Sequence, residues 1–311
     1  MKNGDIREYS LQDADAIELQ EVWVVLWRGK WLLVAVTAIF AICSVLYALR
    51  LPDIYKSEVL LSPVNEQFDG KMSGQLGGLA ALAGISAMGA GDEKVALAIQ
   101  VLKSREFLRK LLDKYQFKAE LMAVNGWEQH SNSLLYDESI YNYADKLWVR
   151  QVKLPYQPEP SLQETHKAFL ESLVVSEDSK AGFITIAVEH YSPYFAQYLN
   201  QLLISELNQD MRQRDITDAE KSIAFLQREA QSTNLNDLRT SLYDMMQDQM
   251  QKLMLANVRD EYIFTVVDPA VIPEQKSRPR RALIVIFITM LGGFVTLCLQ
   301  LFFGLKPKRK N

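Results

Sequence analysis

The sequence predicts an α+β membrane protein, in which two transmembrane helices flank a periplasmic domain with a small membrane-proximal mixed α/β base and a long projecting helical arm. Two observations carry this prediction. Uncharged apolar stretches lie near both ends of the chain, at residues 31–49 and 282–305. Between them, short strand-like runs surround a long region of helical periodicity, which covers residues 193–257.

The two apolar stretches set the topology. Each is long enough to cross the roughly 30 Å hydrocarbon core of a bilayer as a helix. The first stretch begins too far from residue 1 and runs too long for a cleaved signal peptide. Lys and Arg flank the spans evenly on both sides, but long loops are translocated regardless of their charge. We therefore expect cytoplasmic segments at residues 1–30 and 306–311 and a periplasmic domain at residues 50–281.

Composition narrows the class of function. The 311 residues carry a net charge of -4, so there is no overall basic field for nucleic acid. The basic cluster at residues 306–310 is of the kind that contacts lipid headgroups. Both cysteines, Cys43 and Cys298, lie in predicted spans, which predicts a periplasmic domain without disulfides. The cytoplasmic segments are expected to be too short for a kinase or a signalling domain.

The periplasmic segment mixes strands and helices. Residues 55–63 partly alternate apolar and polar side chains and stop at a proline, as a strand does. Residues 92–115 begin with two acidic residues and repeat apolar side chains at helical spacing, which predicts one continuous helix. Residues 173–190 are typical of two neighbouring strands around a polar turn that contains glycine. Residues 261–270 predict one more strand before the second span.

A helix-start signal precedes the strand pair. Ser161 and Glu164 have the spacing of a capping box, in which a serine oxygen and a glutamate satisfy free amide donors of the first turn. We expect a short helix from this box to about Ser172.

The projecting arm is predicted from two consecutive helices. Pro193 opens the first helix, since proline is tolerated in the first turn, and its apolar stripe continues over residues 193–231. The second helix covers residues 237–257. At about 1.5 Å per residue the first helix is about 60 Å long, too long for a compact domain of this size. A narrow arm buries little surface alone, so we expect its stripe to pack on neighbouring copies.

An uncharged, glycine-rich segment at residues 72–91 imitates two catalytic motifs. Gly84 and Gly89 have phosphate-loop spacing, but the Lys and the Ser or Thr that would contact phosphate and magnesium are missing. Residues 84–86 resemble the start of a nucleophile elbow, but Met88 stands where the second glycine is needed. Neither reading supports catalysis.

A third span is the remaining membrane reading of this segment. Gly70, Gly74 and Gly78 repeat every fourth residue, which allows close helix approach in lipid. Few of the residues are large and apolar, however, so the driving force for insertion is weak. We interpret the segment as a small-residue surface for assembly, either loop or helix. Its candidate positions are Gly77, Gly78, Gly84 and Gly89.

No other pattern predicts a chemical site. His130, His166 and His190 are far apart in the sequence, and none has a second ligand at metal-binding spacing. The aromatic residues of 127–156 suit either sugar stacking or core and subunit contacts, of which the second use is commoner. We therefore predict no catalytic residue, no cofactor and no metal site.

Four strings lie in order between the two terminal spans, at residues 76–86, 101–112, 180–196 and 268–284. In this arrangement they resemble the bacterial Wzz-type chain-length determinants, which are polysaccharide co-polymerases. The resemblance covers essentially the whole chain. The proline-rich signature of that family at the second span corresponds here to Pro269, Pro273 and Pro279, and Arg280-Arg281 replace a final proline of some versions.

The resemblance implies a non-enzymatic protein of the bacterial inner membrane that forms a ring of identical subunits with long helices in the periplasm. Such proteins set the chain length of a surface polysaccharide, typically the O-antigen of lipopolysaccharide. The implied partners are other copies of the chain, a separate membrane polymerase, membrane lipids and the growing lipid-linked glycan. The implied subclass lacks a fused tyrosine kinase domain. The alternative is a membrane partner of a separate tyrosine kinase in capsule or exopolysaccharide biosynthesis and export.

The candidate functional positions lie in the connector before the second span and in that span. Proline fixes its backbone angle and has no N–H, so a proline-rich connector is predicted to couple the base to the span with little slack. Gly292 and Gly293 offer a close-contact face where a subunit or the polymerase would dock. The connector positions are Pro269, Pro273, Pro279, Arg280 and Arg281.

Overall fold

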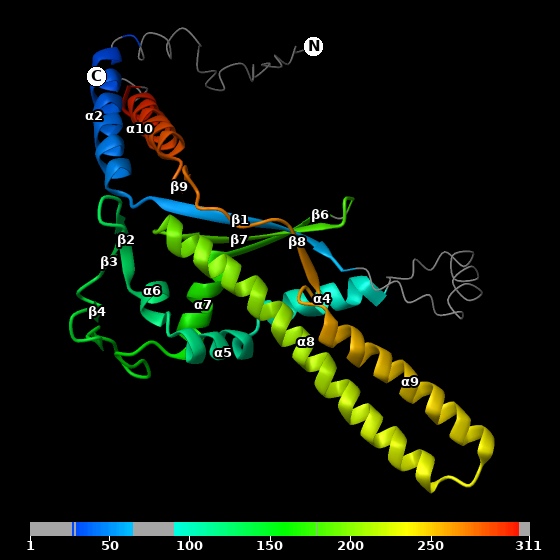
Figure 1. The fold of residues 1–311 in the computed structure, drawn as a ribbon. Helices are drawn as coiled ribbons and strands as arrows, with labels where there is room; N and C mark the ends of the chain where they lie inside the picture. The colour runs from blue at the N-terminus through cyan, green and yellow to red at the C-terminus, as the bar shows by residue number, and fades with distance from the viewer. Residues whose placement is uncertain (1–26, 28, 65–89, 179, 305–311) are drawn as a thin grey trace, which may run out of the picture. The chain divides into compact units, whose positions relative to one another are not determined.

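The computed structural model describes residues 27, 29–64, 90–178 and 180–304 (Figure 1). Residues 72–89 of the glycine-rich segment, with Gly77, Gly78, Gly84 and Gly89, lie outside the described residues, and residues 90 and 91 begin a helix. The chain divides into two compact units. One unit holds the two apolar helices, and the other is the domain of residues 52–277. This arrangement confirms the predicted fold class.

The first unit is an antiparallel pair of long apolar helices. Both are long and apolar enough to cross a membrane, with a mean hydropathy of 2.6 in each. Most of their side chains are exposed, as expected for helices whose solvent is lipid. The helices are α2, Lys30–Arg50, and α10, Arg281–Gly304.

The second unit is built on one sheet. Among the described residues, five strands form this sheet in the order β6-β7-β1-β8, with β9 paired to β1. β1 is antiparallel to β7, from Tyr55 opposite His190 to Leu61 opposite Ile184, and also antiparallel to β8. The strands are β1, Ile54–Pro63; β6, Leu173–Asp178; β7, Phe183–His190; β8, Phe264–Asp268; and β9, Lys276–Arg278.

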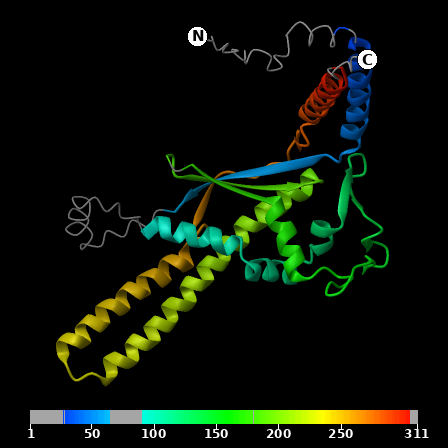
Figure 2. The ribbon, with the colours of Figure 1, turned by 180° about the vertical axis from the view of Figure 1, so that it is seen from behind.

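Helices cover one face of this sheet, as the two opposite views in Figures 1 and 2 show. The core between them contains fully buried Leu61 and Ile184 from the strands and Phe107, Phe169 and Leu203 from the helices. The helices are α4, Ala90–Leu102; α5, Arg105–Tyr115; α7, Leu162–Ser172; and α8, Pro193–Ser232.

The prediction of one continuous helix over residues 92–115 is wrong, because the chain breaks between α4 and α5. The Ser104 side chain accepts a hydrogen bond from the Phe107 amide at 3.1 Å and begins a new helix. Serine competes with the backbone for such bonds and therefore favours helix starts over helix interiors. The break lets Leu102 and Leu108 both reach the core from helices of different direction.

The arm is a hairpin of α8 and α9, Asn236–Val258 (Figure 1). Near its far end Leu226 and Ala230 of α8 pack against Leu242 and Met246 of α9, and these four side chains form a buried cluster. The expectation that this stripe packs on neighbouring copies is therefore wrong for these residues. Helix α9 of the same chain covers these side chains. The connection after Ser232 is short, so α9 runs back antiparallel along α8.

Five short elements at residues 118–148, which we call the excursion, lie between α5 and α7 in the chain. The predicted capping box is confirmed: Ser161 and Glu164 exchange both bonds, and Arg150 adds two bonds to the Glu164 carboxylate at 2.7 and 2.9 Å. The Arg150 hydrogen bond lowers the pKa of Glu164 to about 2. The elements are α6, Lys118–Met122; β2, Val124–Glu128; β3, Ser133–Tyr136; β4, Tyr141–Asn142; and β5, Leu147–Trp148.

Candidate coupling site and surface pocket

The connector after β8 is fastened to the base through its carbonyl groups. Gln197 and Gln201 of α8 both donate to the Ala270 carbonyl, at 3.0 and 3.2 Å. Buried Ser57 of β1 donates to the Val271 carbonyl at 2.8 Å. A proline-rich segment has few amide donors, so side chains of its neighbours supply the donors instead.

Two of the predicted prolines lie on either side of the carbonyl groups that accept these hydrogen bonds. Pro269 is exposed directly after β8, and Pro273 is half-buried on the other side of the fastened pair. The connector then joins the sheet as β9, where Lys276 lies 3.3 Å from Asp53 at the start of β1. The entry and the exit of the domain are thus held side by side. The coupling role of Pro269, Pro273 and Pro279 stays a prediction.

The fastening side chains were not found from the sequence. Gln197 and Gln201 stand one turn apart in α8, but the helix has other amide side chains, such as Asn200, so the spacing alone does not identify this pair. Their role depends on a segment that follows about 70 residues later, which no local pattern identifies.

The two span helices are pinned at both ends. At one end, the Arg281 guanidinium donates to the Leu51 carbonyl at 2.9 Å. At the other end, the Gln300 amide donates to the Gly29 carbonyl at 2.8 Å. The Arg280 carbonyl accepts the first amide bonds of α10 and so begins that helix. Arg281 therefore has a contact within the span pair, and its predicted role in coupling stays a prediction.

The predicted glycine pair lies in the middle of the span pair. A Cβ added to Gly292 would lie 2.5 Å from Cγ of Phe40, whereas one added to Gly293 would lie 3.6 Å from Oγ1 of Thr37. Gly292 is therefore the position at which α2 approaches α10 too closely for a side chain. Buried Thr296 donates to the Gly292 carbonyl at 2.7 Å. Within the chain this face meets the first span, and docking of a subunit or polymerase stays a prediction.

The histidines have structural contacts. His190 is buried, its Nε2 donates to the Glu120 carbonyl at 3.0 Å, and its Nδ1 accepts from the Ser192 amide at 3.1 Å. Burial lowers the pKa of His190 to about 4, so the ring is neutral at pH 7. His166 bonds to the Lys103 carbonyl at the break between α4 and α5. Residues 29–64, 90–178 and 180–304 contain no group of three metal-ligating side chains.

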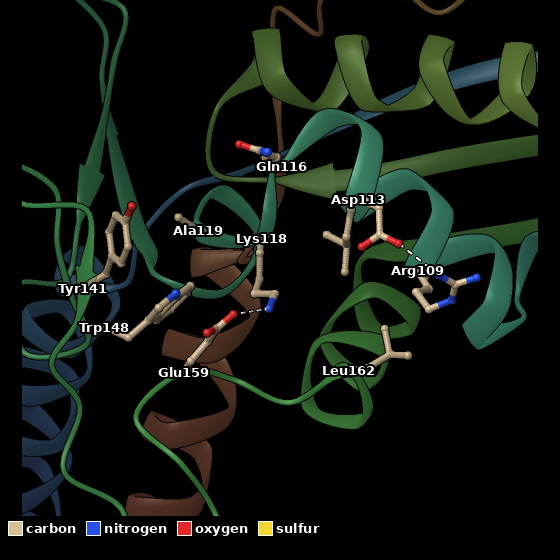
Figure 3. Close-up of a pocket in the computed structure, with 10 residues that line it drawn as sticks. Arg109, Asp113, Gln116, Lys118, Ala119, Tyr141, Trp148, Glu159 and Leu162 are labelled. Atoms are coloured by element: carbon tan, nitrogen blue, oxygen red, sulfur yellow. Dashed lines mark hydrogen bonds and ion pairs between the residues drawn. The ribbon is translucent and has the colours of Figure 1, made fainter.

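A surface pocket of about 400 Å³ lies beside the base, between α5, α6, the β4-β5 pair and the start of α7 (Figure 3). Trp148 and Tyr141 line one side, with ring centroids 4.8 Å apart. Two ion pairs line the pocket as well, Lys118 with Glu159 at 2.5 Å and Arg109 with Asp113 at 3.0 Å.

Two of the aromatic residues of 127–156 have different surroundings, and sugar stacking stays a prediction. Trp127 packs against Tyr55 and Tyr194, with ring centroids 5.6 and 6.1 Å apart, and helps to attach the excursion to the base. Trp148 instead remains half-buried at the pocket.

The fold defines a membrane protein of two spans that carries one α+β domain and a helical arm between them. Residues 15–115 match the family model Wzz, described as "Chain length determinant protein". Residues 219–302 match the family model GNVR, described as "G-rich domain on putative tyrosine kinase". The first match includes the first span, and the second includes the connector and most of the second span, so the chain carries a Wzz chain length determinant domain together with a GNVR domain.

Comparison with solved structures finds a "full-length bacterial polysaccharide co-polymerase", with a TM-score of 0.39 and 14% sequence identity. The match covers 94% of this chain and 100% of that chain. No curated protein sequence matches the chain.

Proposed function

We propose that this protein regulates the chain length of a surface polysaccharide, the O-antigen of lipopolysaccharide, without catalysing a reaction itself. In this proposal it is a homo-oligomeric scaffold in the bacterial inner membrane, with its domain in the periplasm, and it acts on a separate membrane polymerase. The family assignment supports the class of function. The observation that carries the mechanism is the fastened connector, because Asp53 and Lys276 join the two points where the domain continues into its spans.

Non-covalent coupling is sufficient for this task. The length of a polymer depends on the ratio of extension to release at the polymerase. A tenfold change in such a ratio corresponds to about 1.4 kcal/mol. A scaffold that binds the extending polymerase only slightly better than the releasing one supplies this difference. A change in the arrangement of the base must then reach the spans. Because Ser57, Gln197 and Gln201 hold the connector, it has little freedom to move independently of the base.

The outer face of the arm is the surface that we assign to contacts between copies. After the hairpin has formed, α9 still exposes a row of large apolar side chains. Met254 is 66% exposed and Val258 is 82% exposed. Apolar side chains at such density are typical of protein contact surfaces. The exposed row comprises Tyr243, Met250, Met254 and Val258.

Deleting the gene and restoring it on a plasmid tests the proposal. Surface polysaccharide separated on a gel should lose its preferred length in the deletion strain while synthesis continues, and the plasmid should restore the preferred length. Loss of all polymer in the deletion strain would contradict the proposal.

A second function is favoured by one observation. The match of residues 219–302 to a region described on a tyrosine kinase suits a membrane partner of a separate kinase in capsule or exopolysaccharide export. This function predicts that deletion removes bulk polymer together with tyrosine phosphorylation in the membrane fraction. The O-antigen scaffold predicts unchanged phosphorylation and an altered length distribution, so one strain separates the two functions.

A further inference from the structure

We propose that the pocket beside α5 binds one neutral sugar ring of a glycan, with Trp148 as its stacking surface. The inference deepens the proposed function, on which it rests, because that function brings a growing glycan to this domain.

The size and walls of the pocket suit a sugar ring. Its volume of about 400 Å³ lies within the roughly 300–1,000 Å³ of pockets that bind small molecules. A sugar ring has an apolar face of C–H groups and an edge of hydroxyl groups. The pocket offers the matching surfaces, since apolar and aromatic side chains such as Trp148, Leu112 and Leu162 line part of it and charged and amide side chains line another part.

Trp148 is held in place without being covered. In the antiparallel β4-β5 pair, Trp148 lies directly opposite Tyr141. Tyr141 is buried and packs on the Trp148 ring, whereas Trp148 itself stays half-buried at the pocket. An indole fixed from behind presents its free surface to a ligand at little cost in conformational entropy.

The charges of the pocket favour a neutral ligand. Lys118 is paired with Glu159, and Arg109 is paired with Asp113, so the positive side chains are already compensated (Figure 3). An anionic ligand would have to displace a carboxylate from its partner. A hydroxyl both donates and accepts, so it can bond to both members of an ion pair without breaking it.

Gln116 provides a second observation that points to a ligand. Its backbone lies in the left-handed region at the end of α5, with φ of 56°. Its backbone N–H donates to the Leu112 carbonyl at 2.9 Å. Glycine is the usual residue at this position, since other residues are strained there. The strained glutamine places an exposed amide, which both donates and accepts, at the pocket. A strained residue that lines a pocket is a signature of a functional position.

Binding of simple sugars to the purified full-length protein in detergent tests the inference. The neutral probes are the methyl glycosides of glucose, galactose, rhamnose and N-acetylglucosamine, and the charged probe is glucuronate. We expect at least one neutral probe to show saturation-transfer NMR signals and to change tryptophan fluorescence, and glucuronate to bind at least tenfold more weakly. Trp148→Ala should weaken the neutral probe at least tenfold. Gln116→Gly should weaken it at least threefold while the thermal midpoint rises.

Trp127→Phe is the matched control, because that indole packs on Tyr55 and Tyr194 outside the pocket. It should leave the affinity unchanged. The inference is overturned if no neutral probe binds, if glucuronate binds as well as the neutral probes, or if Trp148→Ala and Gln116→Gly both keep the affinity of the original protein.

The inference and the proposed function fail separately. A deletion strain that keeps its polysaccharide length distribution refutes the function, whereas sugar binding that depends on Trp148 still supports the pocket. A deletion strain that loses its preferred length supports the function, and absence of sugar binding in the same protein refutes the pocket alone.

Discussion

The two halves of α8 have different surroundings. In the base, buried Asn200 bonds to the carbonyls of Ser57 and Ile186, so the helix is tied to two neighbouring strands from inside the core. In the arm, α8 contacts α9 through the small cluster around Leu226 and Met246. The Asn200 amide nitrogen thus holds α8 against the sheet, whereas the arm exposes large apolar side chains of α9 such as Val258.

We therefore expect stability to depend on the base and contacts between copies to depend on the arm. Substitutions in the base should change the stability of the whole domain. Substitutions on the outer face of the arm should change its contacts with other copies and leave the domain folded. The predictions that follow begin with the largest expected effect.

Asn208→Leu should destabilise the domain by about 3–5 kcal/mol. The Asn208 amide donates to the Phe264 carbonyl at 3.0 Å, and its oxygen accepts from the amides of Ile263 and Phe264 at 2.9 and 3.0 Å. The substitution leaves three buried backbone groups without partners. Thermal unfolding of the full chain in detergent measures the loss, and Asn257→Leu on the exposed part of α9 is the control. An equal loss in both variants would remove the contrast between base and arm.

Acid should destabilise the base through His190. Its pKa is about 4 in the folded protein and 6.5 in the unfolded chain, so below pH 6.5 the unfolded chain takes up a proton that the folded protein does not. Stability from this group is complete above pH 6.5 and declines as pH falls towards 4, by about 3 kcal/mol in total.

His190→Gln keeps a donor and an acceptor but cannot titrate, so its thermal midpoint should decline less between pH 7 and pH 4.5. His166→Gln, on the surface near the Lys103 carbonyl, should behave like the original protein. If all three proteins lose stability equally over this range, His190 is not the acid-sensitive group.

Leu226→Ala should loosen the arm by about 2 kcal/mol and leave the base unchanged. The side chain is 7% exposed in the cluster between α8 and α9. Hydrogen exchange should therefore accelerate by about 30-fold in the arm and not in the base. Met254→Ala, on the outer face, should leave exchange unchanged and weaken the oligomer in gentle detergent. Faster exchange in both regions would show that base and arm unfold together.

Gly292→Ala should disturb the span pair by about 1–2 kcal/mol, because its new Cβ would collide with Phe40. Gly293→Ala is the matched control, since its Cβ would make an ordinary contact with Thr37. Polysaccharide length should change in the first strain at equal protein level and stay unchanged in the second. Gly292→Leu with Gly293→Leu should abolish length control. Unchanged banding in that double variant would remove the packing role of this face.

The sequence predicted those features that depend on neighbouring residues. The spans follow from hydropathy, and the ends of α8 from Pro193 and the break after Ser232. The capping box of Ser161 and Glu164 is visible in four consecutive residues. In each case the pattern and its physical cause lie within one turn or one stretch of chain.

Features that join distant segments were not predicted. The partner of Leu226 depends on the return path of α9. The break at Ser104 differs, because its cap is local, but the apolar helical spacing continues across it. The carbonyl bonds of the connector depend on Ser57 and Gln197, far away in the sequence. The pocket is assembled from residues 109–119, 141–148 and 159–162, so no single pattern contains it.

Gln116→Gly should stabilise the domain by about 1 kcal/mol, which is the smallest expected effect. Glycine relieves the strain of the left-handed angle at the end of α5, and Gln116 itself is exposed and loses no core contact. Lys146→Gly is the control, because Lys146 has a similar φ of 55° in the turn between β4 and β5 but does not line the pocket. Both variants should raise the thermal midpoint, and only Gln116→Gly should weaken sugar binding. A midpoint that stays the same or falls in Gln116→Gly would mean that its conformation is not strained.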